Sequence, residues 1–136
     1  MADDLKIMHA HITENGESAY AVTIEVSGYT LKGDEPEASG GKDLGPAPYD
    51  MLLAALGECT AMTVRWYALQ QKWPLDKVEV ALSHQKEDRT DHFIKHITLY
   101  GDSLTEEQRT KLIEVAAKCP VQRTLENTPI IETLAA

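Results

Sequence analysis

The segment from Tyr49 to Gln71 carries the pattern that most limits how this chain can fold. Residues 53–57 within it are apolar nearly all round and include Gly57, which costs about 1 kcal/mol of helix propensity relative to alanine. The pattern predicts a long central helix packed on more than one side, with Pro48 in its first turn and Trp73-Pro74 beyond its end. Its expected buried stripe is Leu52, Ala55, Leu56, Cys59, Met62, Thr63, Trp66 and Leu69.

Short runs of alternating or apolar residues on both sides of this helix predict β-strands. Asn15-Gly16 and Ser27-Gly28 separate the first three runs, and such pairs favour tight hairpin turns. The charged segment Lys86–Asp91 is expected to join two later strands as an antiparallel pair. The expected strands are residues 5–12, 20–26, 29–32, 77–85, 93–100 and 128–134, the last an edge strand containing Pro129.

A second helix is predicted from Thr105 to Lys118. Thr105 and Gln108 have the spacing of a capping box, and the apolar stripe of this helix brings Cys119 toward the core at its last turn. Pro120 prevents normal continuation. The order of elements predicts a single α+β domain over residues 1–136, with two sheets available to cover the central helix.

The segment from Gly33 to Pro48 is rich in glycine and proline and has no periodicity. Ordered loops of this length are uncommon unless they serve a site or an interface. The segment is therefore either such a loop or a mobile connection, and its length does not decide between the two.

Size and charge exclude several classes of function. A chain of 136 residues can bury a core without disulfides or structural metals. The 13 Lys and Arg residues against 22 Asp and Glu give a net charge of −9, which repels phosphate backbones and anionic lipid, so neither nucleic acid nor a membrane surface is an expected partner. An acidic amino terminus without a following apolar run, and no apolar run of membrane-spanning length, indicate a cytoplasmic protein.

The two cysteines, Cys59 and Cys119, admit two interpretations. A pair of thiols on the apolar faces of two helices could be redox-active, one attacking and the other resolving the product as a disulfide. Free cysteines are also commonly buried as small hydrophobes. They stand too far apart in sequence for a zinc or CxxC motif, and the histidine pairs at 9/11 and 92/96 have no accompanying ligand cluster, so no metal and no cofactor are expected.

The residues around the two cysteines indicate a particular family more specifically than the spacing of the cysteines does. Cys59 lies in Gly45–Thr63, reading GPAPYDMLLAALGECTAMT, and Cys119 lies in Lys118–Leu125, reading KCPVQRTL. Gly40-Gly41-Lys42-Asp43 precedes the first segment. In these segments and in its order of elements, the chain resembles the OsmC/Ohr family of osmotically induced and organic hydroperoxide resistance proteins.

The resemblance implies an intertwined homodimer in which two long central helices are wrapped by sheets from both chains. It also implies a thiol peroxidase, in which Cys59 matches the peroxidatic cysteine and Cys119 the resolving one. The implied substrate is a hydroperoxide, preferably organic, and the implied reductant is a dithiol such as a lipoylated protein. Cys59 would become a sulfenic acid and condense with Cys119 to a disulfide.

The sequence departs from active members of the family around these thiols. They have an arginine in the amino-terminal strand region, whereas the first arginine here is Arg65, and they have a glutamate where Tyr49 stands. Asp50 either replaces that glutamate or is a first-turn acid favoured by the helix dipole. Arg123 either supplies the missing cation or is an exposed arginine near a helix end.

Other residues leave two classes of function possible, a peroxidase and a non-catalytic protein. Lys6 and Lys42 are further candidate cations, and Gln122 stands where related sequences often have histidine. The departures favour, as the alternative to a peroxidase, a non-catalytic protein. Such a protein would bind a small lipophilic ligand in an apolar cleft beside the cysteines, or would act as a redox sensor without turnover.

Overall fold

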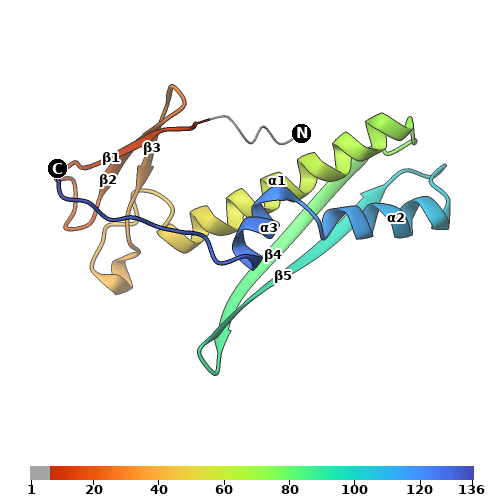
Figure 1. Cartoon of the computed structure of the whole chain (residues 1–136). Helices are drawn as coiled ribbons and strands as arrows, with labels where there is room; N and C mark the ends of the chain where they lie inside the picture. The colour runs from red at the N-terminus through yellow and green to blue at the C-terminus, as the bar shows by residue number, and fades with distance from the viewer. Residues whose placement is uncertain (1–6) are drawn as a thin grey trace. The chain divides into compact units, whose positions relative to one another are not determined.

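The computed structural model describes residues 7–136, which fall into two compact units, residues 7–52 and residues 53–136 (Figure 1). The first unit contains a three-stranded sheet and the second a two-stranded sheet with helices. Helix α1, Pro48–Gln71, begins in the first unit and continues through the second. The expected α+β class with two sheets is confirmed.

The sheet of the first unit is an antiparallel meander in the order β1-β2-β3. Its strands are β1 Ala10–Glu14, β2 Val22–Val26 and β3 Tyr29–Gly33. The predicted turn at Ser27-Gly28 is confirmed, since both residues have positive φ, 49° and 85°.

The connection between β1 and β2 is longer than the predicted tight hairpin. It spans residues 15–21, because the Asn15 side chain accepts a hydrogen bond from the Glu17 N–H and donates one to Thr23 Oγ1. These bonds offer the backbone an alternative to continuing the ladder. Strand β1 begins at Ala10, which pairs with Val26 at the end of β2, and the predicted strand residues Leu5 and Lys6 lie outside the described residues.

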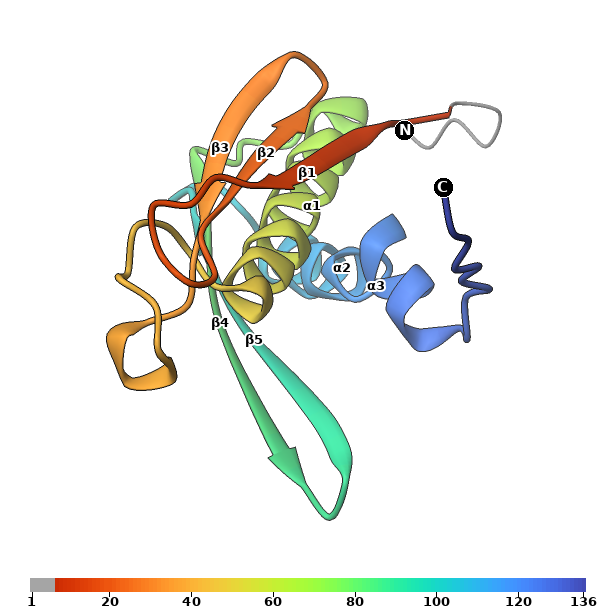
Figure 2. The same cartoon turned by 90° about the vertical axis from the view of Figure 1, so that its left-hand side faces the viewer.

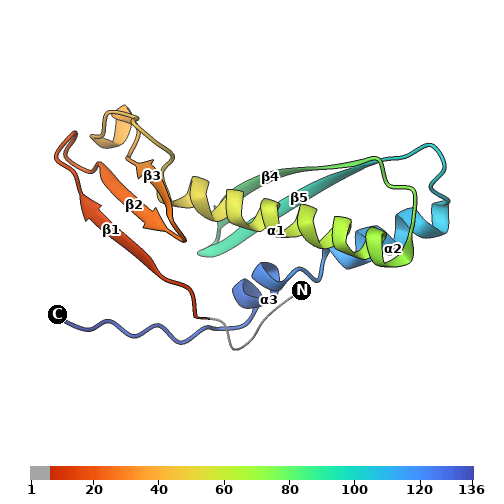
Figure 3. The same ribbon diagram turned by 90° about the horizontal axis from the view of Figure 1, so that it is seen from above.

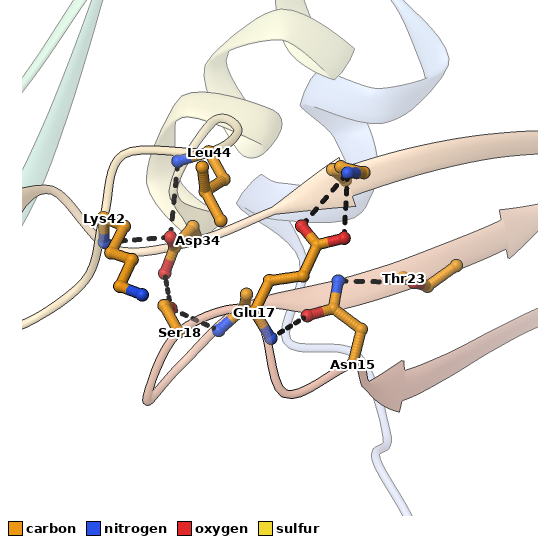
Figure 4. Close-up of polar contacts among 9 residues, drawn as sticks. Asn15, Glu17, Ser18, Thr23, Asp34, Lys42 and Leu44 are labelled. Carbon is orange, nitrogen blue, oxygen red and sulfur yellow. Dashed lines mark hydrogen bonds and ion pairs between the residues drawn. The ribbon is translucent and has the colours of Figure 1, made fainter.

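The loop between β3 and α1 is organised by one buried carboxylate, that of Asp34 (Figure 4). Ser18 Oγ donates to Asp34 Oδ1 at 2.7 Å, and the N–H of Lys42 donates to Oδ2 at 3.0 Å. The N–H groups of Glu35 and Leu44 complete the set at 2.8 and 3.3 Å. The loop folds back so closely that a Cβ on Gly41 would lie 2.0 Å from the Glu35 carbonyl oxygen. These bonds join Ser18, Glu35, Lys42 and Leu44 to one carboxylate, an arrangement that is expected of an ordered loop.

In the second unit, α1 and α2 pack on one face of an antiparallel hairpin (Figure 3). The hairpin consists of β4, Lys77–Glu87, and β5, Thr90–Tyr100, and α2 runs from Glu106 to Ala116. The buried core of this unit comprises Val64, Ala68, Leu75, Leu104, Leu112 and Ala116, against which Val78, Ile97 and Leu99 pack.

The central helix has the predicted extent but not the predicted buried face. Gly57 is buried as expected, and a Cβ there would lie 2.6 Å from Leu82 Cδ1, so its bare backbone lets β4 approach. Met62, Trp66 and Leu69 are exposed, by 56%, 42% and 64%, and their expected burial is wrong for this chain alone. The buried face instead runs through Leu56, Gly57, Thr60, Thr63, Val64 and Ala68.

The β4–β5 hairpin is longer than predicted, and its tip projects beyond the helices (Figure 2). The strands continue through most of the charged segment that the sequence assigned to a connection. Only Asp88 and Arg89 form the turn, with φ of 48° and 65°. Two consecutive residues of positive φ suit a two-residue hairpin turn, which needs no longer loop.

The carboxyl-terminal region differs most from the sequence prediction. Helix α2 ends at Ala116, and Cys119 is the N-cap of a further helix, α3 Pro120–Glu126, rather than part of the last turn of α2. The predicted strand at 128–134 is wrong, because no described strand pairs with it and Ile130, Ile131 and Leu134 are almost fully exposed. No helix of residues 7–136 is long and apolar enough to cross a membrane.

The predicted capping box of α2 is confirmed and provides a test of local stability. Gln108 N–H donates to Thr105 Oγ1 at 3.1 Å, and Thr105 N–H donates to Gln108 Oε1 at 3.0 Å. We expect Thr105→Ala to lower the free energy of unfolding by about 1 kcal/mol in denaturant titrations, because the helix loses its cap. Thr110→Ala, an exposed change within the same helix, is the control and should be neutral or slightly stabilising. Equal losses in both variants would contradict a specific role of the cap.

Candidate functional site

The two cysteines meet inside the second unit. Cys59 extends from the middle of α1 and is partly exposed, whereas Cys119 is fully buried at the start of α3. The two thiols hydrogen bond to each other, so residues 60 positions apart in sequence place their sulfurs in contact. Both cysteines are free, so each has a thiol available for a disulfide.

Two consecutive backbone N–H groups of α3 point at the sulfurs. Val121 N–H donates to Cys59 Sγ at 3.5 Å, and Gln122 N–H donates to Cys119 Sγ at 3.4 Å. The local sequence explains this arrangement. Pro120 is the first helical residue and has no N–H, so the next two residues supply the donors. Cys119 is the N-cap with an extended backbone, and its side chain accepts the hydrogen bond from Gln122 N–H.

Burial dominates the chemistry of Cys59. Its partly apolar surroundings raise the pKa of the thiol, and the neighbouring Cys119 raises it further. The Val121 N–H and the Thr63 side chain hydrogen bond to the sulfur and lower the pKa, but they offset only part of the effect of burial. Cys59 is therefore held mainly as the thiol at neutral pH.

A cation does reach the site, and it is Lys95. Its Nζ donates to Thr60 Oγ1 at 3.0 Å and to the Ala116 carbonyl at 2.7 Å. Burial lowers the pKa of Lys95, and the nearby Cys119, Cys59 and Glu126 act in the opposite direction. Thr60 Oγ1 in turn lies 3.5 Å from Cys119 Sγ, so the ammonium is connected to the buried thiol through one hydroxyl.

Sequence reasoning missed Lys95, although a signal was present. Phe93, Ile97 and Leu99 mark the core-facing side of β5, and Lys95 lies in the same alternation, between Phe93 and Ile97. A lysine in a register that is otherwise apolar faces the interior and needs a partner there. Lys95 could have been found by asking which charged residue occupies a core position.

The supporting residues proposed from sequence, Asp50, Tyr49 and Arg123, are all exposed. In the first unit, Asp50 Oδ2 accepts a hydrogen bond from Ala47 N–H at 2.9 Å, which satisfies a donor at the start of α1. Tyr49 is half-exposed. Arg123 is exposed, and within the described residues its side chain forms no hydrogen bond or ion pair with either cysteine. Lys6 lies outside the described residues, and the Lys42 backbone serves the Asp34 network.

One buried acceptor beside the thiols has no partner. Gln122 Nε2 donates to Glu126 Oε2 at 3.2 Å, and Gln122 Oε1 is buried without a donor from residues 7–136. A buried acceptor without a partner costs stability unless something outside the chain donates to it.

Two other features concern ligands. No group of three or more His, Cys, Asp or Glu side chains that could hold a metal ion occurs in the described part of the chain. An apolar pocket of about 530 Å³ lies in the first unit. Its lining includes neither cysteine and comprises Ile12, Tyr20, Val22, Ile24, Gly33, Asp34, Glu35, Pro46, Pro48 and Met51.

Comparison with known families places this thiol pair in context. Residues 40–133 match the family described as OsmC-like protein, a span that includes both cysteines. The chain belongs to the OsmC-like protein family. The resemblance recognised from the two cysteine segments is thereby confirmed.

Solved structures share the fold of this OsmC-like protein. An OsmC-like protein from Mycoplasma pneumoniae is similar with a TM-score of 0.76 and 17% identity, over 91% of this chain and 90% of that one. The organic hydroperoxide resistance protein OhrB of Bacillus subtilis is similar with a TM-score of 0.62 and 17% identity, over 91% and 93%. An organic hydroperoxide resistance protein OsmC from Legionella pneumophila has a TM-score of 0.62 and 18% identity, over 90% and 91%. A comparison with curated protein sequences finds no significant match.

The hydroperoxide resistance proteins among these structures are less than 20% identical to this chain, so the likeness to them is one of fold. In this chain, Lys95 of β5 is connected to Cys119 through the Thr60 hydroxyl.

Proposed function

We propose that this OsmC-like protein is a thiol-dependent peroxidase that reduces organic hydroperoxides, with Cys59 as the attacking sulfur and Cys119 as the resolving one. The observation that carries the proposal is the contact between the two thiols, which brings a partly exposed sulfur onto a fully buried one. Only Cys59 offers a route for substrate, and only Cys119 lies close enough to close a disulfide on it.

The chemistry consumes one peroxide and two thiols. The Cys59 thiolate attacks one oxygen of the hydroperoxide, the O–O bond breaks, and the alkoxide leaves and takes a proton to become the alcohol. Cys119 then attacks the sulfur of the Cys59 sulfenic acid, the S–O bond breaks, and hydroxide leaves as water after protonation. An external dithiol reduces the disulfide by exchange and is itself oxidised to a disulfide.

Counting thiols after a single addition of peroxide tests this function. Reduced protein is mixed with one equivalent of cumene hydroperoxide or of hydrogen peroxide, and free thiols are counted over time. We expect both thiols to disappear together, and faster with the organic peroxide. Survival of both thiols would reject catalysis by this pair.

We also propose that the protein is a homodimer whose interface includes the exposed apolar stripe of α1, namely Met62, Trp66 and Leu69. These residues follow the spacing of one helix face and leave a contiguous apolar surface in water. A second copy of the chain would cover this surface, in keeping with the burial that the sequence pattern predicted for the stripe.

Substitution at the centre of the stripe tests the dimer. We expect Trp66→Glu to raise the dimer dissociation constant at least ~30-fold, because a buried tryptophan contributes strongly to an interface and a carboxylate there lacks a partner. Sedimentation velocity over a range of concentrations measures the change. Gln70→Glu adds the same charge at an exposed polar position of α1 and should leave association intact. A wild-type chain that remains monomeric at high concentration would refute the interface.

A second candidate function is a redox sensor without turnover, or a protein that binds a lipophilic ligand. The raised pKa of Cys59 favours a slowly reacting thiol, and the apolar pocket of the first unit favours ligand binding. A sensor would form the disulfide slowly and would not consume peroxide repeatedly in the presence of excess dithiol.

A further inference from the structure

Thr60 links the ammonium of Lys95 to the buried sulfur of Cys119. The hydroxyl oxygen of Thr60 has three neighbours: the Leu56 carbonyl at 2.8 Å, Lys95 Nζ at 3.0 Å and Cys119 Sγ at 3.5 Å. Thr60 is fully buried, so water does not substitute for any of these partners.

Counting protons at this hydroxyl gives two states. A hydroxyl has one hydrogen to donate and two lone pairs to accept with. While Cys119 is a thiol, Thr60 donates to the Leu56 carbonyl and accepts from Lys95 and from the S–H group. When Cys119 loses its proton, the Thr60 hydrogen can turn from the Leu56 carbonyl to the sulfur, while Lys95 continues to donate to the same oxygen. The Gln122 N–H points at the sulfur and can donate to it in both states.

We propose that Lys95, acting through Thr60, stabilises Cys119 as a thiolate, so that Cys119 is ready to attack when the disulfide closes. The inference rests on the proposed function for the step it serves, the attack of Cys119 on the Cys59 sulfenic acid. Lys95 is a positioning residue in this step, because its amine reaches the sulfur through the Thr60 hydroxyl.

The same connection serves the return to the dithiol state. Disulfide exchange depends on access to the attacked sulfur and on how well the departing thiolate is stabilised. Cys59 is the accessible sulfur and Cys119 the buried one. An external dithiol therefore attacks Cys59, and Cys119 leaves as the anion that Lys95 and Thr60 stabilise.

The competing explanation of Lys95 is structural. Its second bond, 2.7 Å to the carbonyl of Ala116, satisfies an acceptor in the last turn of α2. A lysine retained only for that bond would influence stability and leave the thiols unaffected. The two roles separate at Thr60, because removal of the Thr60 hydroxyl breaks the connection to Cys119 and leaves the bond to Ala116 in place.

The charged and titratable groups around Lys95 define the background for a test. Cys119 lies at the start of α3, Cys59 faces the amine from α1, and Glu126 faces it from α3. Cys59→Ser removes one titrating thiol and leaves Cys119 as the single cysteine of the chain. In this background, Glu126→Gln measures how much the Glu126 carboxylate contributes to the titration of the remaining thiol.

The experiment titrates the single thiol by the ultraviolet absorbance of its thiolate, which does not require a reagent to reach the buried sulfur. In the Cys59→Ser background, we expect Thr60→Val to move the midpoint of thiolate formation to higher pH by about one unit, a tenfold loss of thiolate at a fixed pH. Lys95→Met should move it in the same direction. Thr60→Ser keeps the hydroxyl and should restore the parent profile. A Cys59→Ser/Cys119→Ser protein supplies the tyrosine baseline.

An unchanged titration in Thr60→Val and Lys95→Met, with only a lower melting temperature, would overturn the proposal and leave the structural role. The titration uses no peroxide, so its outcome is independent of whether the chain is a peroxidase. In protein with both cysteines, Thr60→Val should additionally slow closure of the disulfide about tenfold, seen as longer-lived sulfenic acid that dimedone traps. A normal closure rate in a variant with a shifted titration would also contradict the proposed step.

Discussion

Replacement of Cys59 by serine is expected to lower peroxide consumption by at least ~1,000-fold, because the nucleophile of the proposed reaction is removed. The groups that hydrogen bond at this position are the Val121 N–H, the Thr63 side chain and the Cys119 thiol, and none of them is a base that would activate a serine hydroxyl. The measurement is loss of cumene hydroperoxide in the presence of excess dithiol. Unreduced activity in Cys59→Ser would disprove the assignment of the nucleophile.

The matched variant is Cys119→Ser, which keeps the attacking sulfur and removes the resolving one. It should consume one equivalent of peroxide per chain and stop at a sulfenic acid on Cys59, detected by mass spectrometry after dimedone trapping. Equal activity of wild type and both variants would exclude a disulfide mechanism.

The raised pKa of Cys59 adds a pH dependence to the same assay. Burial keeps most of this cysteine protonated at neutral pH, and the thiolate is the reactive form. Below the pKa, the initial rate of the first turnover should therefore rise about tenfold for each unit of pH. A rate that is flat across the neutral range would show that another step limits turnover.

Substitution of Asp34 by asparagine is expected to produce the largest loss of stability, with the melting temperature falling by about 10 °C. Each oxygen of the Asp34 carboxylate accepts from two donors, Ser18 and Glu35 on one side and Lys42 and Leu44 on the other. An amide replaces one acceptor with a donor, so in either orientation its NH₂ group meets a backbone N–H. Thermal unfolding at neutral pH and fixed protein concentration measures the loss.

Asp43→Asn is the matched control in the same loop. Asp43 is exposed and has a φ of 57°, a conformation that asparagine tolerates well, and the change in charge is identical. It should leave the melting temperature within ~2 °C of wild type. Equal losses in the two variants would mean that charge, rather than the hydrogen bonds of Asp34, stabilises the loop.

The Asp34 network also predicts a dependence on pH. Burial raises the pKa of the Asp34 carboxyl, but the hydrogen bonds from Ser18, Lys42, Glu35 and Leu44 outweigh it, so the pKa lies below its ordinary value. A depressed carboxyl pKa contributes stability that is fully present above the unfolded value of about 3.9 and is lost as the pH falls through the folded value. The difference in melting temperature between wild type and Asp34→Asn should therefore be constant near neutrality and shrink in acid.

The elements with local signals were predicted well from sequence. Pro48 and the spacing of apolar residues defined the extent of α1, and Thr105 with Gln108 defined the start of α2. The tight β4–β5 turn was missed because Asp88 and Arg89 adopt positive φ without a glycine to mark it. The periodicity located the apolar side of α1. It could not show which apolar residues of that side are buried by the rest of the same chain and which remain exposed.

At the site, sequence reasoning identified both cysteines but not Lys95. The cysteines lie in contiguous segments that could be matched, whereas Lys95 reaches them from a strand and is recognised only once β5 is placed beside α1 and α3. Arg123 was a reasonable choice by proximity in sequence, yet it projects from an exposed position of α3. Asp50 accepts a hydrogen bond from the Ala47 N–H, a local role at the start of α1 that the helix-dipole interpretation had not specified.

The extended carboxyl-terminal segment has a consequence for handling the protein. Residues 128–134 combine β-branched and aliphatic side chains with a backbone that pairs with no described strand, and such segments are prone to stack into cross-β aggregates. Pro129, which lacks an N–H, and Glu132, which adds charge, are the kinds of residue that interrupt such stacking. Pro129 and Glu132 are therefore expected to favour the solubility of the isolated chain, although the segment that contains them is not part of the core.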